Sequence, residues 1–128
     1  MDREELNRLT EKIIGIAIEV HRELGPGLLE SVYQKCLAIA LREAGLKIEE
    51  QVPVPVIFRG CQITDDGYRL DILVEGLVIL ELKSVALLAD VNMKQLLTYL
   101  RLLRKPVGLL MNFNEAVLKN GIRRIINL

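Results

Sequence analysis

Aromatic residues and cysteines are scarce in this 128-residue sequence, which has no tryptophan, three tyrosines, two phenylalanines and two cysteines. A nucleic-acid-binding surface built from several stacked rings is therefore not expected. Cys36 and Cys61 lie far apart in the sequence and form no CxxC pair, which argues against a zinc site. Two such cysteines also indicate a reducing, cytosol-like compartment.

An excess of charge of either sign is missing as well, because 17 Lys and Arg residues balance 17 Asp and Glu residues. No field of the whole molecule attracts nucleic acid, so such binding requires a local basic patch. The apolar runs are too short to span a bilayer, and the N-terminal MDREELNRLTEKI is polar and acidic, unlike a signal peptide. With 51% hydrophobic residues, the sequence predicts one cytoplasmic globular domain over residues 1–128, with no membrane partner.

Apolar residues recur at helical spacing in three segments. These segments are residues 6–24, 29–44 and 90–104. Gly25, Gly45 and Pro106 end them, because glycine suits a left-handed cap and proline cannot continue a helix. The spacing predicts that the third helix turns six apolar residues inward: Val91, Met93, Leu96, Leu97, Leu100 and Leu103. Gln95 and Tyr99 lie four apart, off that stripe.

The segments between the helices favour strands. Residues 52–58 alternate at period two, and Pro53 and Pro55 cannot donate hydrogen bonds to a neighbour, which predicts an edge strand. Four further features follow along the chain: a turn at 59–60 with a short strand at 61–64, a second turn at 65–67, a hairpin at 69–84 and a buried strand at 107–113. Residues 122–128 suit either a strand or one helical turn.

The resulting order is α-α-β-β-β-α-β. It predicts an α/β (α+β) fold with a mixed sheet and helices packed on it.

Asp71, Glu81 and Lys83 are set among the apolar residues of the hairpin RLDILVEGLVILELKS. Charged side chains are rarely buried unless they are paired or bind a metal. Glu81 and Lys83 share one face of their strand because side chains alternate. Whether Asp71 joins them depends on the turn that connects the two strands.

Two loop lengths are compatible with the hairpin sequence. A two-residue loop, Glu75-Gly76, pairs Leu70 with Glu81 and puts Asp71 on the opposite face. A three-residue loop at 74–76 pairs Leu73 with Leu77, needs a left-handed residue in its last place, and finds Gly76 there. The second register brings the two carboxylates and the lysine to one face, and it predicts a positive φ at Gly76.

Two carboxylates beside a lysine suit a divalent cation, Mg²⁺ or Mn²⁺, which prefers oxygen ligands and activates water for attack on a phosphate. Lys83 would then orient that water and offset negative charge. The alternative is structural: Lys83 neutralises Glu81 in a salt bridge while Asp71 caps a turn. By composition alone, the pattern Asp-x9-Glu-x-Lys appears in roughly a few per cent of chains of this length, so it is weak by itself, and the residues alone leave both interpretations open.

Four blocks of the sequence resemble the GxxExxY proteins, a family placed in the PD-(D/E)xK nuclease superfamily. The blocks are IEVHRELG, LGPGLLESVY with its Gly27, Glu30 and Tyr33, YRLDILVEGLVILELKS, and QLLTYLRLLRKPVGLLMNF. The resemblance implies a mixed four-stranded, restriction-endonuclease-like sheet flanked by helices, with the site on a bent hairpin. It also implies Asp71 and Glu81 as metal ligands and Lys83 as the catalytic lysine.

The same resemblance gives roles to residues outside the hairpin. Glu30 would be an acidic catalytic residue contributed by an early helix, although a carboxylate near a helix N-terminus also favours the helix dipole. Gln95 would be a polar residue directed toward the site. Tyr33 lies three residues after Glu30 and suits the core, with its hydroxyl on a site carboxylate.

The sequence therefore supports two functions. The first is a Mg²⁺- or Mn²⁺-dependent nuclease acting on DNA or RNA through Asp71, Glu81, Lys83 and Glu30. The second is a non-catalytic module for nucleic-acid binding or protein assembly on a nuclease-like fold. A homodimer would lengthen a nucleic-acid groove. Four basic residues are candidate phosphate contacts, or only a solvated helix face: Lys94, Arg101, Arg104 and Lys105.

Overall fold

The computed structural model describes residues 1–64 and 67–127. Its helices are α1 (Arg3–Leu24), α2 (Glu30–Glu43), α3 (Asp90–Leu103) and the 3₁₀ turn η1 (Leu118–Gly121). Its strands are β1 (Ile48–Pro53), β2 (Ile57–Phe58), β3 (Cys61–Gln62), β4 (Arg69–Val74), β5 (Val78–Lys83), β6 (Val107–Asn112) and β7 (Ile122–Ile126). The turn predicted at Asp65 and Asp66 lies outside the described residues. None of the described helices combines the length and apolar character needed to cross a membrane.

The central sheet is mixed and has the strand order β1-β4-β5-β6-β7. All neighbouring strands are antiparallel except β5 and β6, which α3 connects as a parallel crossover. The predicted fold class is confirmed, with one more strand than expected because residues Ile122–Ile126 pair with β6. The edge position predicted from the prolines is also confirmed for β1.

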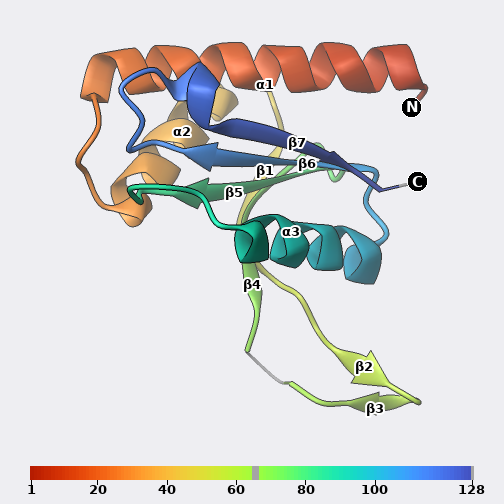
Figure 1. Ribbon diagram of the computed structural model, residues 1–128. Helices are drawn as coiled ribbons and strands as arrows, with labels where there is room; N and C mark the ends of the chain where they lie inside the picture. The colour runs from red at the N-terminus through yellow and green to blue at the C-terminus, as the bar shows by residue number, and fades with distance from the viewer. Residues whose placement is uncertain (65–66, 128) are drawn as a thin grey trace.

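Helices cover both faces of the sheet. α1 and α2 lie over one face and α3 over the other, as Figure 1 shows. Gly108 on β6 allows α3 to approach closely, because a Cβ atom at this position would lie 2.7 Å from Cδ1 of Leu96. Val91, predicted to face inward, is 65% exposed in the first turn of α3. Tyr99, predicted off the apolar stripe, is buried in the core under that helix.

The predicted strand at 52–58 is interrupted. β1 ends at Pro53, and the chain then leaves the central sheet to form the separate β2–β3 hairpin. Arg59 and Gly60 make its turn, both with positive φ, at 49° and 80°. The hairpin projects away from the sheet beyond α3 (Figure 1), and we call residues 56–63 the arm. Its Phe58 and Ile63 are 58% and 61% exposed.

Candidate metal and nuclease site

The turn between β4 and β5 determines which side chains meet. Val74 pairs with Val78, so the loop has three residues, Glu75 to Leu77, one position later than predicted. Glu75 and Gly76 both have positive φ, at 54° and 65°, which confirms the prediction for Gly76. A shift of the loop by one residue moves the pairing by two positions, so each side chain keeps its predicted face.

Asp71 and Glu81 lie on the α3 face of the sheet. Leu73 and Ile79 belong to the core beneath α3, and side chains two residues apart on a strand share a face. The pairing of β4 with β5 extends from Val74↔Val78 only as far as Ile72↔Leu80. Continued by one residue, the register would set Asp71 opposite Glu81.

The two carboxylates accept hydrogen bonds from backbone N–H groups at the point where the backbone pairing of β4 and β5 ends. The backbone N–H of Asp71 donates to Oε1 of Glu81, at 3.2 Å. The backbone N–H of Leu82 donates to Oδ2 of Asp71, at 2.8 Å. Each strand thus presents a carboxylate to the other strand's backbone, which fixes both side chains at one place.

The site is unfavourable for two negative charges. Glu81 is only 6% exposed, and burial, with a smaller contribution from Asp71, raises its pKa to about 8. Burial also raises the pKa of Asp71, although the Leu82 N–H opposes this change. Desolvation and like charge both disfavour ionised carboxylates, so a cation bound here would relieve both effects.

Lys83 follows on the same face of β5. Its charge lowers the pKa of both carboxylates. However, no ion pair within 4.0 Å joins Lys83 to Glu81 or Asp71 among the described residues. The salt bridge that the sequence left open is therefore not formed here, and Lys83 lies near the carboxylates without neutralising either one directly.

Glu30 lies at the edge of this site. It is the first residue of α2, its side chain is exposed, and its Oε1 accepts a hydrogen bond from the Ser84 N–H at 3.2 Å. Its charge contributes to the raised pKa of both Asp71 and Glu81. Within residues 1–64 and 67–127, no three His, Cys, Asp or Glu side chains come close enough to hold a metal ion together. The three predicted carboxylates are thus neighbours, but only two of them are joined by hydrogen bonds at the hairpin.

Tyr33 is buried as predicted, but its hydroxyl does not bond a site carboxylate. It donates to the Gly25 carbonyl and accepts from the Leu28 N–H, and its ring stacks on Phe113 at 4.6 Å between centroids. Tyr33 therefore secures the loop between α1 and α2. That loop leads directly into Glu30, so the influence of Tyr33 on the site is through the backbone.

Tyr99 on α3 lies close enough to the site for Glu81 and Asp71 to affect its pKa. Burial raises the pKa of Tyr99 to about 12, and Glu81, Tyr68 and Asp71 add to the effect in that order. Gln95 lines an apolar hollow next to Tyr68 and Tyr99. No hydrogen bond between described residues joins Gln95 to the carboxylates, so its role at the site stays a prediction.

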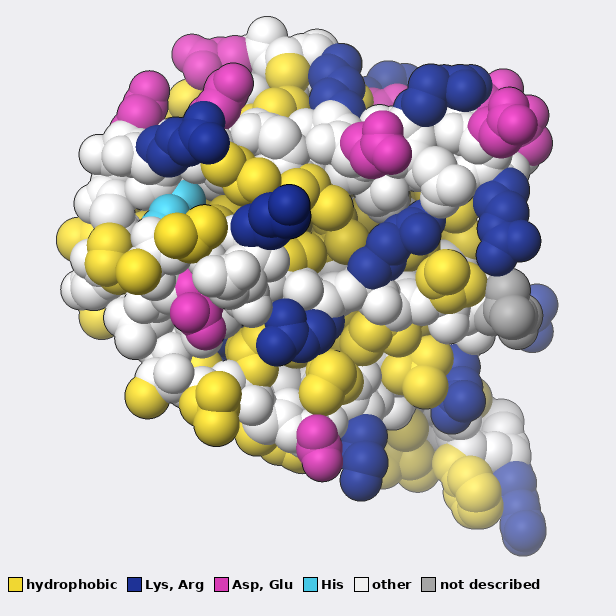
Figure 2. Space-filling model, turned by 45° about the horizontal axis from the view of Figure 1, so that its top comes forward, with side chains coloured by type: hydrophobic (Ala, Val, Ile, Leu, Met, Phe, Trp, Pro, Cys, Tyr) yellow, Lys and Arg dark blue, Asp and Glu magenta, His cyan; other side chains and the backbone are white. Residues whose placement is uncertain are grey.

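The four candidate phosphate contacts lie on or just after α3. Lys94 is exposed near the start of the helix, Arg101 is in its last turn, and Arg104 and Lys105 follow it. Lys105 precedes β6, which begins opposite Val78, whereas Glu81 lies further along β5 opposite Leu110. Arg104 and Lys105 are thus near the end of β5 that is remote from Lys83. On the α1 face, basic and acidic side chains are mixed, without a continuous basic field (Figure 2).

Two polar residues near the site were not predicted from the sequence. Gln51 on β1 has a positive φ of 50° and donates through Nε2 to Oδ1 of Asp71, at 3.3 Å. Asn112 at the end of β6 is fully buried, and its amide bonds both the N–H and the carbonyl of Val85. The one available signal was the polar Asn112 that closes the apolar run VGLLMN, since a buried amide requires partners.

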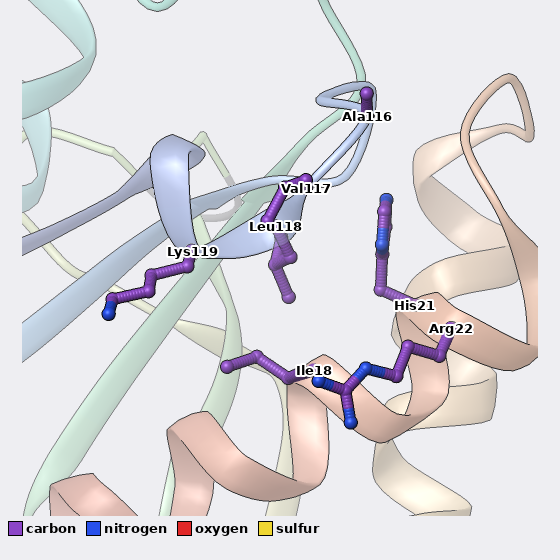
Figure 3. A pocket seen from close by; sticks show the side chains of 7 residues that line it. All are labelled: Ile18, His21, Arg22, Ala116, Val117, Leu118 and Lys119. Atoms are coloured by element: carbon purple, nitrogen blue, oxygen red, sulfur yellow. The ribbon is translucent and has the colours of Figure 1, made fainter.

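A second hollow lies between α1 and the segment around η1, with Ile18 and Leu118 directed toward one another (Figure 3). His21 is buried beside it and donates through Nε2 to the Phe113 carbonyl, at 3.1 Å. The lining of this hollow contains basic and apolar side chains and no carboxylate. Among the described residues, its lining therefore offers no carboxylate ligand to a hard cation, unlike the pair on the hairpin.

Comparison with known proteins bears on this hairpin. The sequence profile of the PD-(D/E)XK nuclease superfamily matches residues 7–125, a span that includes Asp71, Glu81 and Lys83. No curated protein and no solved structure matches the chain. Glu81-Leu82-Lys83 has the (D/E)-x-K form of the superfamily's name, although Leu70 precedes Asp71 where that name has proline. Because the profile covers almost the entire sequence and the sheet is of the mixed α/β type, the chain belongs to the PD-(D/E)XK nuclease superfamily.

Proposed function

We propose that this protein is a nuclease that depends on Mg²⁺ or Mn²⁺ and hydrolyses phosphodiester bonds in DNA or RNA. The proposal rests on the pair formed by half-buried Asp71 and buried Glu81, whose pKa values are both raised and which no cationic side chain neutralises within 4.0 Å among the described residues. Oxygen ligands of this kind fit a hard divalent cation, and water or backbone carbonyls can complete its coordination.

The proposed roles follow from the positions of the side chains. Asp71 and Glu81 would hold the ion. The backbone N–H of Leu82 fixes the Asp71 carboxylate, and the backbone N–H of Asp71 fixes the Glu81 carboxylate. Bound there, the ion would polarise a phosphate oxygen and lower the pKa of a water. The Lys83 ammonium would orient the attacking water and offset negative charge on the phosphate. Glu30 would act at the rim, through its bond to Ser84.

The sequence motif, the two cysteines and the basic residues fit the same function. The motif residues Gly27, Glu30 and Tyr33 support membership of the GxxExxY family, and Tyr33 secures the loop that leads to Glu30. Cys36 and Cys61 are free thiols, which fits the cytoplasmic location expected from the sequence. The candidate phosphate contacts are Lys94, Arg101, Arg104 and Lys105, and a homodimer would extend them into a longer groove.

The test separates metal binding from cleavage. Four proteins are titrated with Mn²⁺ by calorimetry and assayed on single-stranded, duplex and branched substrates at low salt. They are the wild type, Asp71→Ala, Lys83→Ala and the exposed control Lys35→Ala. Asp71→Ala should lose both properties, Lys83→Ala should keep Mn²⁺ binding and lose cleavage, and Lys35→Ala should keep both. Chelator should abolish activity, and Ca²⁺ should bind with little turnover because its coordination geometry is looser.

A second candidate function is a non-catalytic assembly module. The exposed apolar side chains of the arm favour it, because such patches often mark contacts with other proteins. If purified wild-type protein cleaves none of the substrates with Mg²⁺ or Mn²⁺, while the variants bind nucleic acid as wild type does, the nuclease proposal fails and this function replaces it.

A further inference from the structure

Gln51 occupies an unusual position next to Asp71. It lies on β1, where the register sets it opposite Asp71, between the pairs Glu50↔Ile72 and Val52↔Leu70. Its φ of 50° is in the left-handed region, which is uncommon for a residue other than glycine and costs free energy. A conformation of this kind persists only where surrounding contacts hold it, and the Gln51 carbonyl accepts a hydrogen bond from Nη1 of Arg69 at 3.0 Å.

The Gln51 side chain also has two partners. Its Nε2 donates to Oε1 of Gln34 at 2.6 Å and to Oδ1 of Asp71 at 3.3 Å. A side-chain amide carries two N–H donors on one nitrogen, so both bonds can form at once. Asp71 is then held through both oxygens, with Oδ2 on the Leu82 N–H and Oδ1 on Gln51.

The residues behind Gln51 determine which end of its amide faces Asp71. Arg42 bonds Oε2 of Glu50, and Nε2 of Gln34 donates to Oε1 of the same carboxylate, each at 3.1 Å. A carboxylate only accepts hydrogen bonds, so Gln34 must direct its nitrogen to Glu50 and its oxygen to Gln51. Gln51 must then present its nitrogen, and an amide in the reverse orientation would set its oxygen against both neighbours.

We propose that Gln51 is a positioning residue for Asp71, and that Arg42, Glu50 and Gln34 fix the orientation of its amide. This chain of hydrogen bonds runs from the solvent-exposed end of α2, across β1, to the carboxylate proposed to bind the metal. Residues of this kind hold a ligand at the angle that a cation requires, and their loss usually weakens metal affinity by about 10- to 100-fold. This inference rests on the proposed function, because it assigns Asp71 as a metal ligand.

The experiment measures Mn²⁺ affinity by calorimetry, together with thermal melting in chelator. Gln51→Gly removes the amide but suits the left-handed backbone, so the protein should fold with an unchanged or slightly higher melting temperature. Its Mn²⁺ affinity should fall by about tenfold. Gln34→Ala, which does not touch Asp71, should weaken binding by a smaller factor. Gln62→Ala on the arm is the matched control and should bind as wild type does.

A double variant shows whether Gln34 and Gln51 act on Mn²⁺ affinity through one chain of hydrogen bonds or independently of each other. If Gln34 acts only through Gln51, then Gln34→Ala combined with Gln51→Gly should bind Mn²⁺ no more weakly than Gln51→Gly alone. Losses that multiply, or a Gln51→Gly variant with wild-type affinity, would overturn the inference while the metal site stands. Wild-type protein that binds no Mn²⁺ would instead overturn the proposed function, and this inference with it.

Discussion

Glu81 links the candidate site to the stability of the protein. Its pKa is 4.5 in an ordinary environment and about 8 in the fold, so the folded state holds a proton that the unfolded state releases between these values. The free energy of unfolding therefore falls as pH rises from about 4.5 to about 8 and levels off above that range. In the absence of metal, the contribution of Glu81 is largest below pH 4.5 and is lost above pH 8.

Replacing Glu81 by Gln should remove this pH dependence, because the amide stays neutral and its oxygen can still accept the Asp71 N–H. In chelator, Glu81→Gln should match wild type near pH 4.5 and be more stable near pH 8, by roughly a few kcal/mol. Melting curves across this pH range measure the difference. Glu49→Gln, at an exposed position on β1, should give the wild-type profile. A Glu81→Gln variant less stable than wild type at pH 8 would show that Glu81 is ionised and paired in the fold.

At the scale of single elements, the packing of α3 on β6 depends on one missing side chain. A Cβ at Gly108 would meet Leu96, a buried residue whose Cγ and both methyl carbons would lie between 2.7 and 3.1 Å away. We expect Gly108→Ala to destabilise the protein by about 1–3 kcal/mol through overpacking, measured by chemical unfolding.

The matched substitution on α1 should have the opposite sign. Gly15 is exposed in the helix interior, and a Cβ there would meet nothing within 4 Å. Gly15→Ala should therefore stabilise the protein by about 0.5–1 kcal/mol, the usual difference in helix propensity. Equal effects of the two substitutions would refute a close approach between α3 and β6.

The success of sequence-based prediction differed between elements for identifiable reasons. Helical periodicity and glycine or proline stops placed all three helices, because these signals are local. The three-residue loop inferred from Gly76 placed Asp71 and Glu81 on one face, although the loop begins one residue later than expected. The bond of the Gln51 side chain to Asp71 and the bonds of the Tyr33 hydroxyl could not be predicted, since both join groups that only tertiary packing brings together. The end of β1 at Pro53 was missed because the alternating pattern continues into the arm without interruption.

For the whole molecule, the arm is the part least connected to the rest. The substitutions Phe58→Ser and Ile63→Ser should each change the free energy of unfolding by only about 0.5 kcal/mol or less, because both side chains are exposed. Leu110→Ala, in the buried core under α3, should cost about 2–5 kcal/mol in the same chemical unfolding experiment. A large loss from the two arm substitutions would mean that the arm packs against a surface in solution, such as a second copy of the chain.

The carboxylates that replace backbone carbonyls between β4 and β5 also provide a spectroscopic reporter. The N–H groups of Asp71 and Leu82 each donate to a carboxylate that would hold the proposed ion. A bound cation would change the charge and the protonation of these carboxyl groups, and with them the strength of both hydrogen bonds. In a ¹H–¹⁵N correlation spectrum, the signals of Asp71 and Leu82 should therefore shift as Mg²⁺ is added, while those of amides bonded to carbonyls remote from the site, such as Leu6 on Asp2, stay in place.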